Sequence, residues 1–161
     1  MNQEQIHKIL EEVTDPEIPV ITIAELGILK EVNIDENDKI TVSITPTYAG
    51  CPAMDMITVN IKAVLQVYGY NNIEVISLLD PAWTTDWISE AGKQKLLEYG
   101  IAPPAEKSLD LSFITGKSPE VQCPRCLSVN TQLISRFGST ACKALYKCID
   151  CLEPFDYFKC H

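Results

Sequence analysis

The segments Cys123-Pro-Arg-Cys126 and Cys148-Ile-Asp-Cys151 lie near the end of this chain of 161 residues. In each segment two cysteines separated by two residues close a tight loop and direct two sulfurs toward one point. The residues between the segments are numerous enough for a β-hairpin that brings the two loops together. This spacing predicts a tetrahedral site with four thiolate ligands. Zn²⁺ is the expected ion, although four thiolates also suit iron or an iron–sulfur cluster.

A closed four-thiolate site stabilises a fold and leaves no coordination position open for a substrate. We therefore expect the metal to be structural and to supply much of the folding free energy of residues 120–161, on the order of 10 kcal/mol. A redox-active dithiol at Cys123 and Cys126 is the less favoured alternative, because such sites use one cysteine pair rather than two. Cys142 and Cys160 lie outside the paired spacing. Each is a candidate additional ligand, reactive thiol or packed side chain.

Residues 1–104 are predicted to form a compact α+β domain, followed by a connector over residues 105–119. Apolar spacing and turn residues predict a helix–hairpin–helix–strand order and then a second short helix. The expected elements are a helix over 3–13, strands over 28–34 and 39–45, a helix after Pro52, a well-buried strand over 73–79 and a helix over 86–99. The predicted fold class is thus α+β, with a small zinc-ribbon-like β domain after the connector.

Cys51 lies in the loop that precedes the second predicted helix. The unpaired N–H groups and the positive end of the helix dipole favour a thiolate there, which is the form that attacks electrophiles and binds soft metals. Asp15, next to Pro16, is a candidate base or oxygen ligand near this cysteine. The alternatives are a buried structural cysteine at position 51 and a turn-capping aspartate at position 15.

The composition excludes several classes of function. Residues 1–118 carry a formal charge of −10 and the remaining residues carry +1, which gives the net charge of −9. Such an acidic surface disfavours nucleic-acid binding. The chain has no run of ~20 apolar residues that would span a membrane. Its polar N-terminus lacks the apolar segment of a signal peptide, so the cytoplasm is the expected location. In that compartment, cysteines more often bind metal or react than form disulfides.

Three segments of the first domain resemble the SufT-like iron–sulfur-assembly domain. They are residues 15–20, 23–28 and 45–52. In this family the characteristic cysteine corresponds to Cys51 and the characteristic acid corresponds to Asp15. The resemblance implies the same helix–hairpin–helix–strand order and a role in handling iron–sulfur clusters.

Further segments resemble the PaaD family, whose members are accessory components encoded with the phenylacetyl-CoA epoxidase. They are residues 83–87, 99–104, 137–143 and 153–160, so the resemblance runs nearly from end to end. It implies a partner among the oxygenase or reductase subunits of this multicomponent enzyme, which acts in aerobic phenylacetate degradation. The chain has no carboxylate–histidine set for a di-iron site and no nucleotide-binding loop. We therefore expect no catalysis by this chain alone.

Two functions are compatible with these features. In the first, the protein is a maturation factor that assists insertion of an Fe–S cluster or iron into the epoxidase complex. Cys51 is then a transient cluster ligand tuned by Asp15, and the four-cysteine domain is a docking platform. In the second, the protein is a non-catalytic structural subunit of the oxygenase complex. A homodimer is compatible with either function, and the sequence leaves the metal, the client and the oligomeric state open.

Overall fold

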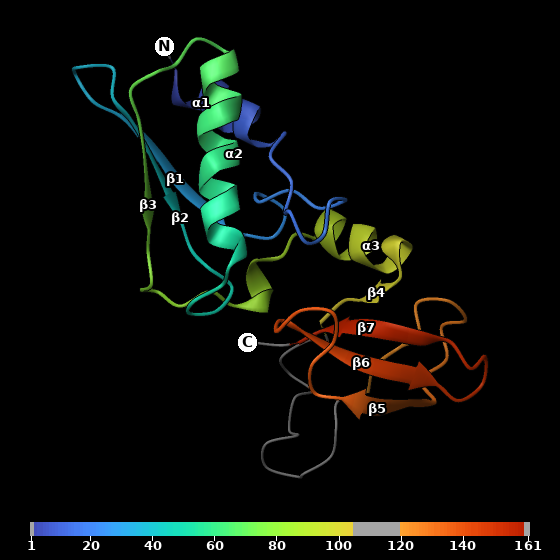
Figure 1. Cartoon of the computed structure of the whole chain (residues 1–161). Helices are drawn as coiled ribbons and strands as arrows, with labels where there is room; N and C mark the ends of the chain where they lie inside the picture. Colours follow the sequence, from blue (N-terminus) through green and yellow to red (C-terminus); the bar gives the residue numbers. More distant parts are fainter. Residues whose placement is uncertain (1, 105–119, 160–161) are drawn as a thin grey trace. The chain divides into compact units, whose positions relative to one another are not determined.

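The computed structural model describes residues 2–104 and 120–159, which belong to two compact units (Figure 1). The first unit comprises Met1–Trp83 and Trp87–Ser89, and the rest of the chain belongs to the second. The fold class is α+β, as predicted. The expected connector lies outside the described residues.

The first unit has the predicted order of helix, hairpin, helix and strand. Its elements are α1 (Gln3–Leu10), β1 (Leu29–Ile34), β2 (Ile40–Ile44), α2 (Ala53–Val67) and β3 (Ile73–Ser77). Helix α1 ends earlier than the apolar spacing predicts. Val13 does not extend the helix, because its carbonyl oxygen accepts a hydrogen bond of 2.9 Å from the N–H of Ile23. The chain that follows α1 is therefore hydrogen-bonded to the loop that contains Ile23 and is not helical.

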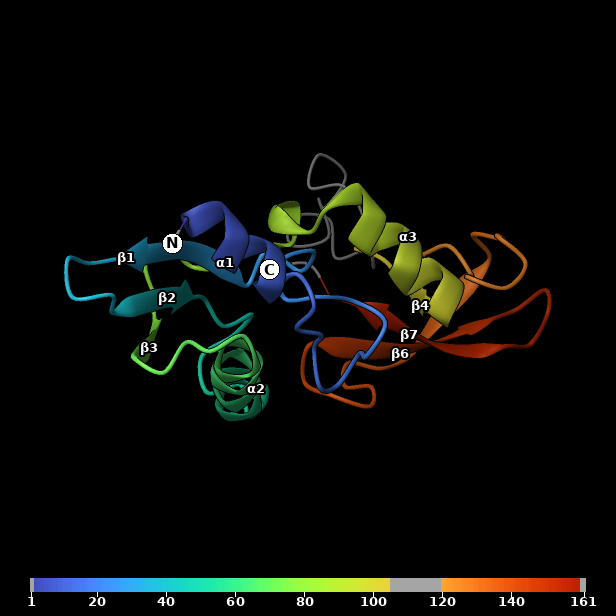
Figure 2. The ribbon, with the colours of Figure 1, turned by 90° about the horizontal axis from the view of Figure 1, so that it is seen from above.

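The three strands form a sheet in the order β1-β2-β3, with β1 antiparallel and β3 parallel to β2. Helix α2 connects the two parallel strands, since a parallel pair cannot be joined by a tight turn. Helices α1 and α2 pack against each other. Helix α1 also contacts β1, and α2 also contacts β3. Figure 2 shows α2 end-on beside the sheet. The fully buried Val42 lies in register with Val32 and Val75, which places the apolar core between the sheet and these helices.

The prediction that residues 73–79 form a well-buried strand is wrong. Strand β3 lies at the edge of the sheet, and none of its residues is fully buried. Ile76 is 36% exposed. Successive side chains of a strand alternate between two faces, and only the face toward α2 is covered here. A short apolar run does not by itself distinguish an edge strand from a central one.

Two tryptophans dock the segment after β3 onto the loop that leads into β1. The indole N–H of Trp83 donates a 2.9 Å hydrogen bond to the carbonyl oxygen of Leu26. The ammonium group of Lys30 lies 3.0 Å from the centre of the Trp87 ring, and burial lowers the pKa of this lysine. Between these contacts, Gly27 adopts a φ of +70° and lies directly against the Trp87 backbone. These contacts fix the loop that precedes β1.

The second unit contains a four-stranded sheet and a helix. Its elements are η1 (Thr85–Trp87, shared with the first unit), α3 (Glu90–Tyr99), β4 (Ile101–Ala102), β5 (Thr131–Ser135), β6 (Lys143–Cys148) and β7 (Pro154–Phe158). The strand order is β4-β7-β6-β5, with β4 parallel to β7 and the other pairs antiparallel. The predicted hairpin is the β5–β6 pair. None of the described helices is long and apolar enough to cross a membrane.

Sequence reasoning missed strands β4 and β7. Ile101 pairs with Asp156 and Ala102 pairs with Tyr157, so two residues expected to end the first domain belong to the sheet of the second unit. The expected boundary at residue 104 stays a prediction. Pairing between segments so distant along the chain leaves no local pattern, which explains why the spacing did not predict it.

The structure predicts that Gly27→Ala destabilises the first unit by about 3 kcal/mol. A Cβ on Gly27 would lie 2.6 Å from both the Cβ and the carbonyl oxygen of Trp87, and the positive φ adds strain. Urea unfolding followed by tryptophan fluorescence measures this change.

Gly69→Ala is the matched control, because Gly69 has a φ of +91° with nothing within 4 Å of an added Cβ. It should cost about 1 kcal/mol, the conformational cost alone. Equal losses in the two variants would contradict the argument that the Trp87 contact decides the effect.

Candidate functional site

The structure brings together the four cysteines that the sequence predicts as metal ligands. The Sγ atoms of Cys123, Cys126, Cys148 and Cys151 all lie within 4.8 Å of one another. The distance from Cys123 Sγ to Cys151 Sγ is 3.7 Å, and that from Cys126 Sγ to Cys148 Sγ is 3.5 Å. A tetrahedral ion with metal–sulfur bonds of ~2.3 Å holds its sulfurs ~3.8 Å apart. The donor set therefore fits a single tetrahedral ion.

The sheet of the second unit positions these sulfurs from two loops. Cys148 ends β6, and both Cys123 and Cys148 are fully buried, whereas Cys126 is exposed. The first loop is closed by a 2.9 Å hydrogen bond from the N–H of Leu127 to the carbonyl oxygen of Cys123. In the second loop the N–H of Cys151 points at Cys148 Sγ at 3.5 Å. One cysteine of each pair is thus anchored in the core.

Polar contacts join the two cysteine loops to each other. Arg125 forms an ion pair with Glu153, with 2.5 Å between Nη1 and Oε2. The carboxylate of Asp150 accepts hydrogen bonds from the Ser128 hydroxyl and, at 2.8 Å, from the side-chain amide of Asn130. These contacts hold the loops in register, so that four sulfurs converge on one position.

The thiols of Cys148 and Cys126 differ in acidity. Backbone N–H groups, that of Cys151 first, lower the pKa of Cys148 to about 7. For Cys126 the backbone N–H of Ser128 acts in the same direction, but desolvation and the neighbouring sulfurs outweigh it and raise the pKa to about 12. A metal ion must displace the protons that these sulfurs hold, so its apparent affinity rises with pH.

Cys51 lies in the loop between β2 and α2 and is half-buried. Its N–H donates to the carbonyl oxygen of Tyr48, and its carbonyl oxygen accepts from the N–H of Met54, both at 3.3 Å. The N-cap residue Pro52 makes no side-chain hydrogen bond to the first turn of α2. Cys51 therefore directly precedes a helix N-terminus, as predicted. It also follows the carboxyl end of a strand in a parallel pair, which is where open α/β sheets bind ligands.

Asp15 is 7% exposed and holds a turn. Its Oδ1 accepts hydrogen bonds from the N–H groups of Glu17 at 2.8 Å and Ile18 at 2.9 Å. These bonds are those expected of the turn-capping alternative. A role for Asp15 in tuning Cys51 stays a prediction.

The loops that carry Asp15 and Cys51 are attached to the same end of the sheet. The Asp15 loop runs from residue 13 to residue 28, and its last residue, Ile28, accepts a 2.8 Å hydrogen bond from the N–H of Thr45. Thr45 directly follows β2, and the chain continues from there to Cys51. The loop that carries Asp15 and the loop that carries Cys51 therefore both join the sheet at the carboxyl end of β2.

The structure places Cys142 apart from the four-sulfur set. It is buried, and its Sγ lies 3.0 Å from the hydroxyl oxygen of Thr140. Among the described residues, the group of potential ligands within 4.8 Å of one another does not include it. Cys160 lies outside the described residues, so a role for either cysteine as an extra ligand stays a prediction.

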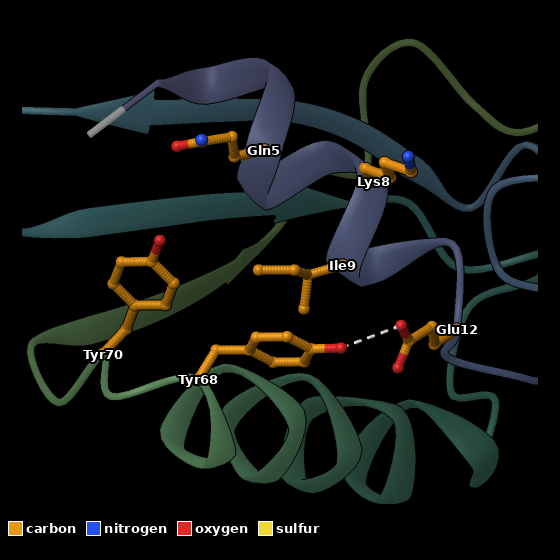
Figure 3. A pocket seen from close by; sticks show the side chains of 6 residues that line it. All are labelled: Gln5, Lys8, Ile9, Glu12, Tyr68 and Tyr70. Atoms are coloured by element: carbon orange, nitrogen blue, oxygen red, sulfur yellow. Dashed lines mark hydrogen bonds between the residues drawn. The ribbon is translucent and has the colours of Figure 1, made fainter.

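Sequence reasoning missed an open hollow of about 400 Å³ between α1 and the end of α2 (Figure 3). It is lined by Gln5, Lys8, Ile9, Glu12, Tyr68 and Tyr70. The Tyr68 hydroxyl donates a 3.0 Å hydrogen bond to Glu12, which raises the pKa of Tyr68. Neither Cys51 nor Asp15 lines this hollow, so it is separate from the predicted cysteine chemistry.

Two family models match successive parts of the chain. The iron–sulfur cluster assembly protein model matches residues 3–75, and the PaaD zinc beta ribbon domain model matches residues 109–159. An Escherichia coli (strain K12) protein, named as one of the subunits of a "Putative 1,2-phenylacetyl-CoA epoxidase", is 48% identical over 159 residues. That match covers 97% of this chain and 93% of the Escherichia coli protein.

Other relatives match the first part of the chain. The Fe–S protein maturation auxiliary factor SufT of Staphylococcus aureus (strain USA300) is 37% identical over 82 residues, which cover 50% of this chain and 92% of that protein. The crystal structure of a domain of unknown function from Bacillus anthracis superposes with a TM-score of 0.54 at 33% identity. That match covers 58% of this chain and 90% of the other, and it supports the fold of the first unit.

Cys148→Ser should release the metal and unfold the ribbon while the first unit stays folded. The substitution removes one ligand from the buried half of the site, and metal binding supplies on the order of 10 kcal/mol to such domains. Metal analysis and limited proteolysis measure the two effects. Both tryptophans belong to the first unit, so their fluorescence should not change.

Cys142→Ser is the control, because it removes a buried thiol from the same unit without touching the four-sulfur set. This variant should keep its metal. A protease-resistant ribbon in Cys148→Ser after the metal is lost would contradict the structural role of the ion.

Proposed function

The chain belongs to the PaaD family, and from that premise we propose that it is a maturation factor for the phenylacetyl-CoA epoxidase complex. It assists the insertion of an Fe–S cluster, or of iron, into a subunit of that complex during aerobic phenylacetate degradation. The main observation behind the proposal is that one chain contains both an iron–sulfur assembly domain and a PaaD zinc ribbon domain. The near full-length likeness to a protein named as an epoxidase subunit supports a partner within that complex.

Cys51 is the proposed point of contact with the transferred cluster. It is half-buried, lies before the N-terminus of α2 and follows the carboxyl end of β2. The positive end of the α2 helix dipole lies next to Cys51. A single thiolate holds an iron atom weakly enough to release it, which suits a carrier better than a permanent site.

The transfer that we propose is a ligand exchange. The Cys51 thiol releases its proton to solvent, and its sulfur replaces one ligand of the protein that delivers the cluster at one of the iron atoms. A thiolate of the client subunit then displaces Cys51, with no change in oxidation state. Asp15 is a positioning residue in this scheme, because its Oδ1 fixes the turn at Glu17 and Ile18 in a loop attached to the same end of the sheet.

The four-cysteine centre is proposed to hold a structural Zn²⁺. Sulfurs within 4.8 Å of one another suit one ion, whereas a cluster of several irons would spread its thiolate ligands over different iron atoms and hold them further apart. When bound, the ion supplies folding free energy to the ribbon and no open coordination position. The ribbon then serves as a docking platform, and the cluster transfer belongs to the first domain.

A structural subunit of the oxygenase is the second candidate function. The hydrogen bonds of Asp15 favour this function. They give the buried carboxylate a structural role in its own turn, so its presence does not require a role in tuning Cys51. Stable stoichiometric co-purification with active oxygenase would support this function. A maturation factor should instead be absent from the mature enzyme.

Cys51→Ala should abolish cluster carriage and leave the fold intact. We expect anaerobically purified wild-type protein to contain about one zinc per chain together with iron and acid-labile sulfide. The variant should keep the zinc and lose the iron and sulfide. In cells that lack the wild-type gene, the variant should yield an epoxidase complex deficient in iron.

Cys142→Ala provides the matched control, since it removes a buried thiol from the other unit. It should retain the iron and sulfide. Full restoration of an iron-loaded, active client by Cys51→Ala would remove Cys51 from the mechanism. Zinc alone in wild type and variant, after attempted cluster reconstitution, would favour the structural subunit.

A further inference from the structure

Two leucines adopt a backbone conformation that normally selects glycine. Leu127 has a φ of 63° and Leu152 has a φ of 65°. They hold equivalent positions, each directly after the second cysteine of its pair. A left-handed conformation brings the Cβ of an ordinary residue close to the backbone, so glycine or asparagine is favoured there. Both cysteine loops nevertheless carry the same bulky apolar residue at this point.

Packing within the chain does not account for these leucines. Leu127 is 55% exposed and Leu152 is 64% exposed, so neither side chain fills the core. Two further aliphatic residues of the same loops are also exposed, Val129 by 62% and Ile149 by 44%. The N–H of Ile149 donates a 2.9 Å hydrogen bond to the carbonyl oxygen of Asn130, next to Val129, which ties the two loops together. We refer to these four side chains as the aliphatic tip.

The charged groups of the two loops are already paired with groups of the same loops. Arg125 pairs with Glu153, and Asp150 accepts hydrogen bonds from Ser128 and Asn130. The tip therefore presents aliphatic carbon beside one ion pair and one hydrogen-bonded carboxylate, and the only Lys or Arg side chain of the two loops is already paired. Nucleic acid and anionic lipid surfaces are bound through unpaired Lys and Arg side chains, so this chemistry favours an uncharged, apolar protein surface.

The size of the tip indicates the kind of contact it makes. Four side chains with these exposed fractions present on the order of 400 Å² of apolar surface in total, spread over two loops that the Ile149–Asn130 hydrogen bond joins. A standard stable interface buries about 800 Å² on each partner. The tip is therefore too small to hold a permanent dimer alone, and it suits the centre of a transient contact.

We propose that the aliphatic tip docks into an uncharged apolar depression on another protein subunit of the epoxidase complex. The inference rests on the proposed function for the identity of the complex and adds the surface that recognises it. Leu127 and Leu152 are the central contacts, held outward by their left-handed backbone. The bound ion fixes the loops, which explains how a structural metal supports recognition without touching the client.

Leu127→Gly/Leu152→Gly tests the proposal with full-length, metal-loaded protein. Binding is measured by titration against the oxygenase and reductase components, purified from cells that lack this chain. We expect the double variant to bind at least ten times more weakly than wild type. Its melting temperature should equal or exceed that of wild type because glycine relieves the strained φ. Its metal content should be unchanged.

Leu127→Asn/Leu152→Asn is a second variant, which tests whether weaker binding of the glycine variant comes only from a more flexible loop. Asparagine tolerates the left-handed conformation, so the loop shape is kept while the apolar surface is lost. The matched control is Ile134→Ser/Phe137→Ser, which removes two exposed apolar side chains of the same unit, 53% and 66% exposed. The asparagine variant should lose binding, and the control should bind as wild type does.

Three results would overturn the proposal. They are wild-type affinity in both leucine variants, equal loss in the Ile134/Phe137 control, or no binding of wild type to any component. A wild-type dimer that the glycine variant dissolves would assign the tip to a second copy and would also overturn it. Cys51→Ala should bind normally. If that variant matures the client fully, the proposed role of Cys51 in maturation is wrong, whereas the docking result stands.

Discussion

Four cysteine sulfurs within 4.8 Å of one another form the site whose proposed metal stabilises the second unit. Cys123 and Cys148 belong to the buried core of this unit, where Tyr146 packs against Phe155 and Tyr157 with ring centroids 6.1 and 5.5 Å away. A core of this size contributes little on its own, since small domains bury a low fraction of their surface. A metal contribution on the order of 10 kcal/mol is comparable to the whole stability of an ordinary domain. In the proposed metal-bound form, this contribution stabilises the strand pairing and the loop contacts of the second unit.

The first unit depends on a different constraint. A parallel β2–β3 pair requires a crossover, and α2 supplies it. The crossover places the N-terminus of α2 at the carboxyl end of β2, and Cys51 lies between them. The Trp83 and Trp87 contacts then fix the loop before β1, which pairs with β2. The position of the candidate cysteine is thus a consequence of topology rather than of local sequence.

The cysteines of the two units have different proposed roles. The four ribbon cysteines saturate one ion and leave no open position, so their site suits a permanent metal. Cys51 stands outside such a set, which suits a ligand that binds and releases. The left-handed leucines beside this site, Leu127 and Leu152, are the residues through which we propose that the metal-bound loops recognise a partner. Backbone strain at exposed apolar residues persists only where the surrounding structure enforces it, and here the closed cysteine loops do so.

The sequence by itself determined the ligand set and the order of elements. Two Cys-x-x-Cys pairs specify four thiolates because the local loop geometry needs no other part of the chain, and period-two and helical spacing predicted the elements of the first unit. Tertiary structure alone decided that β3 is an exposed edge, that Ile101 and Ala102 join β7, and that Leu127 and Leu152 are strained and exposed. Each of these depends on which distant segment lies alongside or on a backbone angle that residue type does not reveal. Spacing along a chain encodes local geometry, whereas pairing partners and burial are set by the whole fold.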